Sequence, residues 1–345
     1  MSLLPEDSEL ILERTEPIWK ALAGERLFIT GGTGFFGRWI LESLVHANQR
    51  LNQKTTCVVL TRDATAFLTA MPALGANAAI GFHSGDLTSF DFPAGAFSHV
   101  LHMGTTTSQA TFNSEPPLAK FANIVNGTER VLQFAAQCRA SKFLLTSSGA
   151  VYGWQPDGVQ HMTEDERCAP PPEHTASAIG HSKRTAEFLT VAHGEAHGFD
   201  AIVARCFSFV GKHLPLDIHY AIGNFIRDML AGGPIDVRGD GTPQRSYLYA
   251  ADLVIWLMTM LCEGMPGRVY NVGSEEAVSI GDLAQRVARL GPAGIQVRLR
   301  TQSAAAPVLD RYVPSTKRAE RELGLRPMIG LDEAIARTIR SLGLN

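Results

Sequence analysis

A glycine-rich turn between a strand-like run and a helix-like run constrains the fold of this chain most. Residues 27–30 are apolar, with aromatic and β-branched members, and they predict a buried parallel strand. Gly32, Gly34 and Gly37 then satisfy the pattern G-x-G-x-x-G, and residues 38–46 continue with helical periodicity. Glycine supplies the backbone angles of such a turn and lets a pyrophosphate approach, while the helix N-terminus offers unpaired N–H groups. The stretch therefore predicts dinucleotide binding, with cofactor contacts from Gly31, Thr33, Gly34, Phe35, Phe36 and Gly37.

Length and composition narrow the class of protein. The 345 residues suffice for one large α/β domain with a smaller partner domain, and the net charge of −3 gives no electrostatic footprint for nucleic acid or an anionic membrane. The five cysteines stand singly, which favours a reducing compartment, and the eleven histidines show no metal-ligand spacing. Neither a signal peptide nor an apolar run of membrane-spanning length is visible. We expect a cytoplasmic protein without a metal.

Strand-like and helix-like segments alternate along most of the chain, which predicts an α/β fold with a doubly wound parallel Rossmann sheet. Ahead of it, Asp7 or Ser8 is expected to cap a first helix. The expected helices include 118–139 and 178–197. The expected division is a helical extension (1–24), a dinucleotide-binding domain (25–206, with a return segment near 246–272) and a smaller C-terminal α/β substrate-binding domain (207–345).

The second and later strands predict where the rest of the cofactor lies. An acidic residue at the end of the second strand would accept hydrogen bonds from a free ribose 2′-hydroxyl, but this strand ends in Arg62, which suits a 2′-phosphate and favours NADP. Asp63 keeps NAD open, and an exposed Arg–Asp pair in a turn is the alternative without a ligand. Further contacts are expected from residues at the ends of the third and fourth strands, namely Asp86, Leu87, His102 and Gly104. The run 104–108, rich in hydroxyl groups, is either part of that ligand crevice or a plain turn.

Several motifs together carry a family resemblance. They are Gly31-Gly-Thr-Gly-Phe-Phe-Gly37, Gly85-Asp-Leu87, Asn123-Ile-Val-Asn-Gly-Thr128, Ser147-Ser-Gly-Ala-Val-Tyr-Gly153, Gly180-His-Ser-Lys183, Gly239-Asp-Gly-Thr-Pro-Gln-Arg245 and Asp310-Arg-Tyr312. On these residues the chain resembles the extended short-chain dehydrogenases/reductases, the nucleotide-sugar epimerase and dehydratase group. The resemblance implies NAD or NADP as a tightly held redox partner, a nucleoside-diphosphate sugar as ligand, and a homodimer built through helices 121–139 and 178–197.

The same resemblance implies a catalytic triad of serine, tyrosine and lysine, of which this chain lacks the tyrosine. Members of the group carry a tyrosine four residues before a lysine on one helix, with a serine or threonine from the fifth strand. Lys183 matches the lysine, which also holds the nicotinamide ribose, and Ser148 matches the serine. The tyrosine position is Ile179, which cannot exchange a proton. Lys183 itself is one possible base if burial depresses its pKa.

Other side chains were weighed as replacements for the tyrosine. His181 is expected to point away from the site, because two residues along a helix turn it by about 200°. His174 or Glu173, on the preceding loop, are placed to reach inward, whereas the resemblance gives Tyr152 a structural role. Loss of oxidoreductase chemistry with retained ligand binding stays open beside a replacement base.

The group's pattern also indicates which reaction is favoured and which residues are expected to bind the substrate. The Asp-Glu pair of the 4,6-dehydratases, whose glutamate the decarboxylating members keep, is Gly149 and Ala150 here, so an epimerase or 4-keto-reductase ranks first. A catalytically impaired cofactor- and sugar-nucleotide-binding relative, and a 4,6-dehydratase with unusual acid/base residues, are the alternatives. Asn224, Arg245 and Arg311 match residues that contact the diphosphate, unless the arginines make surface or interdomain ion pairs.

Overall fold

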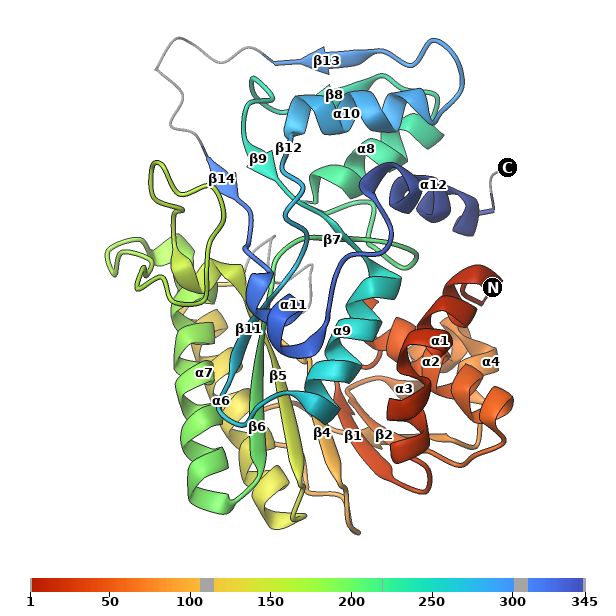
Figure 1. The fold of residues 1–345 in the computed structure, drawn as a ribbon, viewed down its shortest axis with the longest axis vertical. Coiled ribbons are helices and arrows are strands. Elements are labelled where there is room, and N and C mark those ends of the chain that lie inside the picture. The colour runs from red at the N-terminus through yellow and green to blue at the C-terminus, as the bar shows by residue number, and fades with distance from the viewer. Residues whose placement is uncertain (1, 106–114, 219, 301–309, 344–345) are drawn as a thin grey trace.

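A seven-stranded parallel sheet forms the centre of the molecule, in a computed structural model that describes residues 2–105, 115–218, 220–300 and 310–343 (Figure 1). The strand order is β11-β6-β5-β4-β1-β2-β3, with the reversal beside β1 that marks a doubly wound sheet. The bounds are β1 Arg26–Thr30, β2 Thr56–Thr61, β3 Ile80–Ser84, β4 His99–His102, β5 Lys142–Ser148, β6 Asp200–Cys206 and β11 Val269–Val272. The predicted fold class is confirmed.

Helices cover both faces of this sheet (Figure 1). On one face, α1 (Pro5–Ala21), α2 (Phe35–Leu51) and α9 (Ala250–Glu263) bury Trp19, Trp39 and Trp256 in the larger apolar core. On the other face, α6 (Pro117–Gln137) and α7 (Ala178–His197) close a second core around Phe28, Phe134 and Phe143. The short helices α3 (Ala64–Ala70) and α4 (Pro72–Gly75) follow β2. Burial of strands on both faces explains their nearly continuous apolar runs.

The first helix begins earlier than the sequence predicted. α1 starts at Pro5, and no side chain caps its N-terminus, so the expectation that Asp7 or Ser8 caps it is wrong. Proline at the first helical position sets the start, because its fixed φ angle suits a helix and its missing N–H costs no bond there. Asp7 instead is buried, and it accepts hydrogen bonds from Tyr249 (2.6 Å) and Arg337 (2.7 Å).

Most of the remaining elements form a smaller lobe at one end of the main sheet, whereas α11 packs against β11 and α9 (Figure 1). Its short sheets are β12-β9-β14, β13-β8 and β10-β7. Tyr312 pairs with Arg245 in the register of β14 and β9. The bounds are β7 Phe209–Val210, α8 Ala221–Leu230, β8 Ile235–Val237, β9 Gln244–Arg245, β10 Leu248–Tyr249, β12 Val278–Ser279, α10 Ile280–Arg289, β13 Val297–Leu299, β14 Arg311–Tyr312, α11 Lys317–Leu323 and α12 Leu331–Ser341. β11 returns from this part of the chain to pair with β6, while the domain boundaries themselves stay a prediction.

Candidate functional site

The glycine turn after β1 leaves no room for side chains. Gly31 has a φ of +72°, and a Cβ there would lie 2.7 Å from the carbonyl carbon of Met103. A Cβ on Gly37 would lie 2.3 Å from the Cα of Gly32, so glycine allows the helix to pack against the turn. Gly34 caps α2 without a side-chain hydrogen bond, which leaves the first N–H groups of the helix bare. These features fit the pyrophosphate of a dinucleotide.

The other predicted residues of the turn lie beside it. Thr33 is partly buried, and its carbonyl accepts a hydrogen bond from Arg38 Nε at 2.9 Å. Phe35 and Phe36 are also partly buried, and the Phe36 ring meets Phe209 edge to face with a centroid distance of 5.0 Å. The structure therefore gathers these residues at the N-terminus of α2, and their cofactor contacts stay predictions.

Arg62 and Asp86 come together where β2 and β3 end. Arg62 is exposed immediately after β2. Two hydrogen bonds from Thr88 lower the pKa of Asp86, and the charge of Arg62 contributes to that shift. Asp63 uses its carboxylate to cap α3, accepting from Ala66 N at 2.8 Å. Both Arg62 and Asp63 are exposed at this strand end, and their contacts with a ribose substituent stay predictions.

His102 is buried in the protein interior, and Leu87 is partly buried against the second core. Leu87 lies under α6, so a Cβ on Gly127 would be 2.7 Å from its Cδ2. His102 is buried, with its ring nitrogens 2.7 Å from Thr30 Oγ1 and 3.1 Å from Thr128 Oγ1. Burial lowers the pKa of His102 to about 3, so the ring is neutral. With both nitrogens engaged, His102 holds the ends of β1 and β4 against α6, and its side chain is not free to bind a cofactor.

Gly104 takes part in the same arrangement. Its N–H donates to Thr30 Oγ1 at 2.9 Å, and a Cβ there would lie 2.9 Å from the same oxygen. The chain therefore passes close to β1 beside the glycine turn, as expected for the edge of a ligand crevice. Residues 106–108 of the predicted hydroxyl-rich run lie outside the described residues.

Lys183 is buried at the end of β5, near Ser148. Its Nζ donates a hydrogen bond of 2.8 Å to the carbonyl of Thr146. Burial lowers the pKa of Lys183 to about 8, against the opposing influence of Cys206 and Glu187. Ser148 ends β5, and its Oγ accepts from Ala150 N at 3.1 Å. The structure thus brings the lysine and the serine to one strand end, with an ammonium that stays mostly protonated at pH 7 and loses its proton around pH 8.

Tyr312 reaches the same place from the smaller lobe. Burial raises the pKa of its phenol to about 12, and a side-chain hydrogen bond with Ser148 opposes that rise. A Cβ on Gly149 would lie 2.6 Å from the Tyr312 hydroxyl, which locates the phenol over the start of the 3-10 turn Gly149–Tyr152. The sequence motif Asp310-Arg-Tyr contained this tyrosine, but sequence reasoning used only its arginine.

A cavity of about 420 Å³ in the smaller lobe joins Asn224 and Arg245. Four arginines line it, namely Arg227, Arg238, Arg245 and Arg300. Arg227 donates to Asn224 Oδ1 at 3.1 Å, and Arg245 pairs with Asp310 at 2.7 Å. This concentration of guanidinium groups suits a diphosphate. Arg227, Arg238 and Arg300 were missed by sequence analysis, because only the folding of α8, β8 and β13 together reveals them.

Arg311 does not line that cavity. Its Nε donates to the carbonyl of Gln160 at 2.7 Å, and its Nη1 donates to the Gln244 side chain. The guanidinium therefore ties β14 to β9 and to the loop after the fifth strand. The structure brings together two of the three residues expected to hold a diphosphate, Asn224 and Arg245, and gives the third a different set of partners.

A family model decides the classification. The model described as the NAD dependent epimerase/dehydratase family matches residues 27–273, which is more than half of the chain. The chain belongs to this family. The family resemblance inferred from the motifs is thereby confirmed.

Curated relatives of this epimerase/dehydratase family member are nucleotide-sugar enzymes at low identity. The chain is 26% identical over 314 residues to UDP-glucuronic acid decarboxylase 6 of Arabidopsis thaliana, covering 90% of this chain and 86% of the relative. It is also 26% identical over 323 residues to dTDP-glucose 4,6-dehydratase of Streptomyces antibioticus, covering 91% of each.

Solved structures share the fold over nearly the whole length. A dTDP-glucose 4,6-dehydratase from Streptomyces venezuelae, with NAD and TYD bound, aligns with a TM-score of 0.76 at 22% identity, covering 92% of this chain and 97% of the other. A UDP-glucose 4-epimerase from Thermotoga maritima, with UDP-glucose, aligns with a TM-score of 0.76 at 18% identity, covering 92% and 98%. RMD from Pseudomonas aeruginosa, complexed with NADPH, aligns with a TM-score of 0.70 at 22% identity, covering 92% and 98%. At these identities the likenesses show the fold.

Three of the side chains weighed as replacement bases in this epimerase/dehydratase family member, His181, His174 and Tyr152, contact other residues, and the fourth, Glu173, is exposed. His181 lies 3.2 Å from the Pro171 carbonyl, in keeping with its expected direction. The His174 ring meets the exposed Trp154 edge to face at 4.7 Å, and Glu173 is exposed. Tyr152 is buried and donates to Asn271 Oδ1 at 2.8 Å. Ile179 is partly buried in the first turn of α7, one turn before Lys183.

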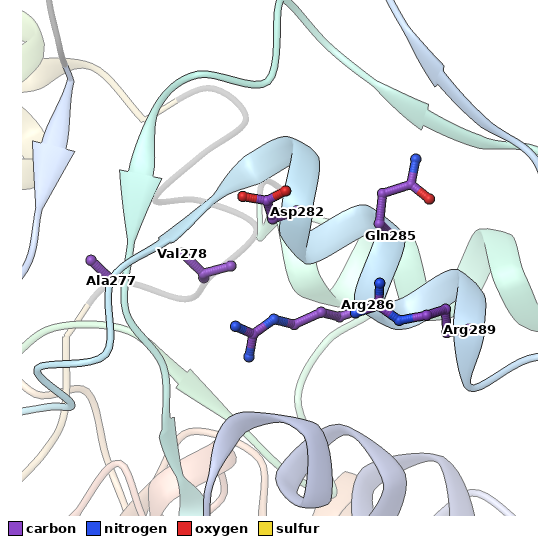
Figure 2. A pocket seen from close by; sticks show the side chains of 6 residues that line it. All are labelled: Ala277, Val278, Asp282, Gln285, Arg286 and Arg289. Atoms are coloured by element: carbon purple, nitrogen blue, oxygen red, sulfur yellow. The ribbon is translucent and has the colours of Figure 1, made fainter.

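A second, smaller cavity is lined by residues of α10 and of the segment just before it (Figure 2). It measures about 270 Å³, and Figure 2 shows Arg286 extending beside Val278 and Ala277. Arg286 pairs with Glu276 at 2.7 Å and with Asp332 at 3.3 Å. This cavity is lined by two arginines, Arg286 and Arg289, whereas four arginines line the one with Asn224 and Arg245, so the larger cavity is the better candidate for an anionic ligand.

Proposed function

We propose that this protein is a nucleotide-sugar epimerase or 4-keto-reductase that uses NAD or NADP and an atypical proton-transfer group. The observation that carries the proposal is the buried amine of Lys183, held at the end of β5 near Ser148 in a fold whose glycine turn fits a dinucleotide. The curated relatives and the neighbours with bound UDP-glucose or TYD support a nucleotide sugar as substrate class.

In this proposal, each part of the site has one task. The nicotinamide, when bound, supplies or accepts a hydride. The bare N–H groups of the glycine turn hold its pyrophosphate, and Lys183 holds its ribose while adding positive charge near the reacting oxygen. Ser148 donates to the sugar oxygen, and Asn224 and Arg245 hold the diphosphate of the sugar nucleotide.

The geometry around Gly149 argues against the dehydratase alternative. A Cβ at this position would lie 2.6 Å from the Tyr312 hydroxyl and 2.8 Å from the Phe207 ring. An aspartate, as the dehydratases are expected to carry there, would displace both aromatic side chains. Ala150 next to it cannot exchange protons either. The relatives are decarboxylases and dehydratases, but this chain lacks room for their acid at that place.

The second candidate function is a binding protein that no longer turns over its ligands. Ile179 favours it, since an aliphatic side chain occupies the position of the expected proton acceptor. The glycine turn and the cavity with Asn224 and Arg245 are compatible with either candidate.

Mass spectrometry of co-purifying small molecules, followed by single-turnover assays, tests the proposed function. UDP- and dTDP-linked 4-keto-6-deoxyglucose are offered with NADH or NADPH, and UDP-glucose is assayed for conversion to its 4-epimer. Nicotinamide absorbance reports reduction, and chromatography of the sugars reports epimerisation. Turnover of any of these supports the proposal. Tight binding of cofactor and sugar nucleotide without turnover supports the binding protein, and no binding of either contradicts both.

We propose NADP as the preferred cofactor, with Arg62 on its 2′-phosphate. Replacing Arg62 by alanine is expected to weaken NADP binding by about 1–3 kcal/mol, as for a lost hydrogen bond to a charged group, and to leave NAD binding nearly unchanged. Calorimetric titration of both cofactors gives the two affinities. An equal loss for NAD and NADP would show that Arg62 does not contact the 2′-phosphate.

Arg245 is proposed to anchor the diphosphate of the sugar nucleotide. Arg245→Ala is expected to weaken UDP-glucose or UDP binding about 10-fold or more, because a charge-assisted hydrogen bond is lost. Arg286→Ala is the matched control, since this arginine lines the other cavity and is paired with two carboxylates. Unchanged affinity in Arg245→Ala, measured by calorimetry, would remove the residue from the site.

A homodimer through α6 and α7 is proposed as the assembled state. These helices pack against each other and still expose large apolar side chains, among them Leu118 (85% exposed) and Phe188 (71% exposed). Phe188→Asp is expected to shift a dimer to a monomer in light scattering after size-exclusion chromatography. Met265→Asp, at an exposed position outside the two helices, serves as control. A monomeric parent would contradict the proposal.

We propose that the protein works in a reducing, cytoplasmic compartment. All five cysteines are free thiols. In the described part of the chain, no helix is long and apolar enough to cross a membrane, and no three His, Cys, Asp or Glu side chains are grouped to hold a metal ion.

A further inference from the structure

Tyr312 occupies a position from which a phenol can meet a ligand at Ser148. It belongs to β14 of the smaller lobe, yet its hydroxyl lies over Gly149, the residue that follows Ser148 at the end of β5, so that a Cβ on Gly149 would be 2.6 Å from it. An interaction with the Ser148 side chain opposes the rise in the pKa of the phenol. Its ring packs against Phe207, with centroids 4.6 Å apart. The side chain is only partly buried, as expected for a group that borders a ligand site.

Gly149 makes this position possible. The ideal Cβ of any other residue would stand 2.6 Å from the Tyr312 hydroxyl and 2.8 Å from the Phe207 ring. Gly149 has no positive φ that would otherwise require glycine. The absent side chain therefore serves to admit the phenol next to Ser148.

The pairing of β14 with β9 places Tyr312 next to Arg245, the residue proposed to bind the diphosphate. Tyr312 pairs with Arg245 of β9, and Arg245 lines the cavity with Asn224. A sugar nucleotide held by Arg245 at its diphosphate would extend its sugar along this short sheet toward the main sheet. Tyr312 and Ser148 are then neighbours of the sugar ring.

We propose that Tyr312 is the proton donor to the sugar carbonyl oxygen, in place of the tyrosine that Ile179 replaces. This inference rests on the proposed function. As the carbonyl carbon accepts a hydride from reduced nicotinamide, the Tyr312 O–H bond breaks and its proton bonds to the carbonyl oxygen, which becomes a hydroxyl. The phenolate left behind regains a proton from solvent, directly or through the Ser148 hydroxyl.

The electrostatics of the phenol favour the reducing direction. Burial raises the pKa of Tyr312 to about 12, so the phenol is fully protonated at neutral pH and ready to donate. A donor with so high a pKa is weaker than one near the working pH. Slow turnover of a keto sugar is therefore expected from the parent protein.

The kinetic test uses Tyr312→Phe, which keeps the ring on Phe207 and removes only the hydroxyl. With NADPH and dTDP-4-keto-6-deoxyglucose in single turnover, the rate is expected to fall about 10²-fold, within the usual range for general acid catalysis. The affinity for dTDP and the melting temperature should not change. Tyr152→Phe is the matched control, because that phenol donates to Asn271 inside the protein. An unchanged rate in Tyr312→Phe would overturn the assignment.

A second measurement does not depend on turnover. Tyrosine labelled with ¹³C at Cζ gives one signal for each of the six tyrosines, and Tyr312→Phe identifies one of them. Adding dTDP-4-keto-6-deoxyglucose without cofactor should shift that signal, whereas dTDP alone should leave it in place. A shifted signal without any hydride transfer supports the position of Tyr312 while the proposed function fails. A saturating keto sugar that leaves the signal unmoved overturns the inference, whatever the activity.

Discussion

Glu187→Ala is expected to lower the free energy of unfolding by about 3–5 kcal/mol, the range for breaking a buried ion pair from one side. Glu187 lies on α7, and Arg205 on β6 grips its carboxylate with Nη2 at 2.7 Å and Nε at 3.0 Å. Both side chains are nearly buried, at 9% and 12% exposed. Removing the carboxylate leaves the guanidinium charged, desolvated and without its partner.

The pair also supports the end of β5, which carries Ser148. Ser147 Oγ donates to Glu187, and the Arg205 guanidinium lies 4.7 Å from the centre of the Tyr152 ring. The loss in Glu187→Ala should therefore appear in activity as well as in stability. Urea unfolding followed by circular dichroism gives the free energy, and single-turnover hydride transfer gives the effect on the site.

Three variants separate the charge effect from packing. Glu187→Gln keeps the volume and part of the hydrogen bonding, and it should cost less than Glu187→Ala. A double variant, Glu187→Leu with Arg205→Met, should recover much of the loss, because buried ion pairs are often replaceable by apolar residues. Glu320→Ala breaks the exposed pair with Arg326 and should cost at most about 1 kcal/mol. A loss below about 1 kcal/mol in Glu187→Ala would show that the carboxylate contributes little.

The sequence predicted those parts of the fold that depend on residues adjacent in the chain. The helix expected at 178–197 is α7 with the same bounds, because its helical periodicity ends at Gly198, which has a φ of +75°. The glycine turn was equally predictable, because its strand, turn and helix follow one another in the sequence. The parallel sheet followed from strands and helices that alternate along the chain.

What escaped prediction depends on contacts between distant parts of the chain. Asp7 looks like a helix cap in sequence, but Tyr249 and Arg337 take its oxygens only once the fold brings them there. His102 looked like a ligand contact at a strand end, and its two threonine partners came from β1 and α6. Tyr312 comes next to Gly149 and Ser148 only because β14, which pairs with β9 in a separate short sheet, is folded against the end of β5. Such partners have no local sequence signal.

Ile179→Tyr is expected to raise hydride transfer between bound cofactor and a nucleotide hexose by roughly 10²-fold or more. Residue 179 lies in the first turn of α7, one turn before Lys183, so both face the same side of the helix. A phenol there would stand near the Lys183 ammonium, whose positive charge lowers the phenol pKa toward the working range. Proton transfer is most efficient when the pKa of the group is near the operating pH, so the new tyrosine should outperform Tyr312, whose pKa is raised to about 12.

Ile179→Phe is the matched control for this gain, because it adds the ring without the hydroxyl and should leave the rate near that of the parent. The gain should also survive in the double variant Ile179→Tyr with Tyr312→Phe, since the phenol at 179 no longer needs the one on β14. Nicotinamide absorbance in single turnover is the readout, with cofactor and sugar affinities measured beside it. Two results would contradict the prediction. A parent that already turns over at about 1–10³ s⁻¹, the range typical of enzymes, has no missing proton-transfer group to restore. A variant that binds both ligands without a gain means that the pocket around Lys183 no longer has the shape that a tyrosine at 179 requires.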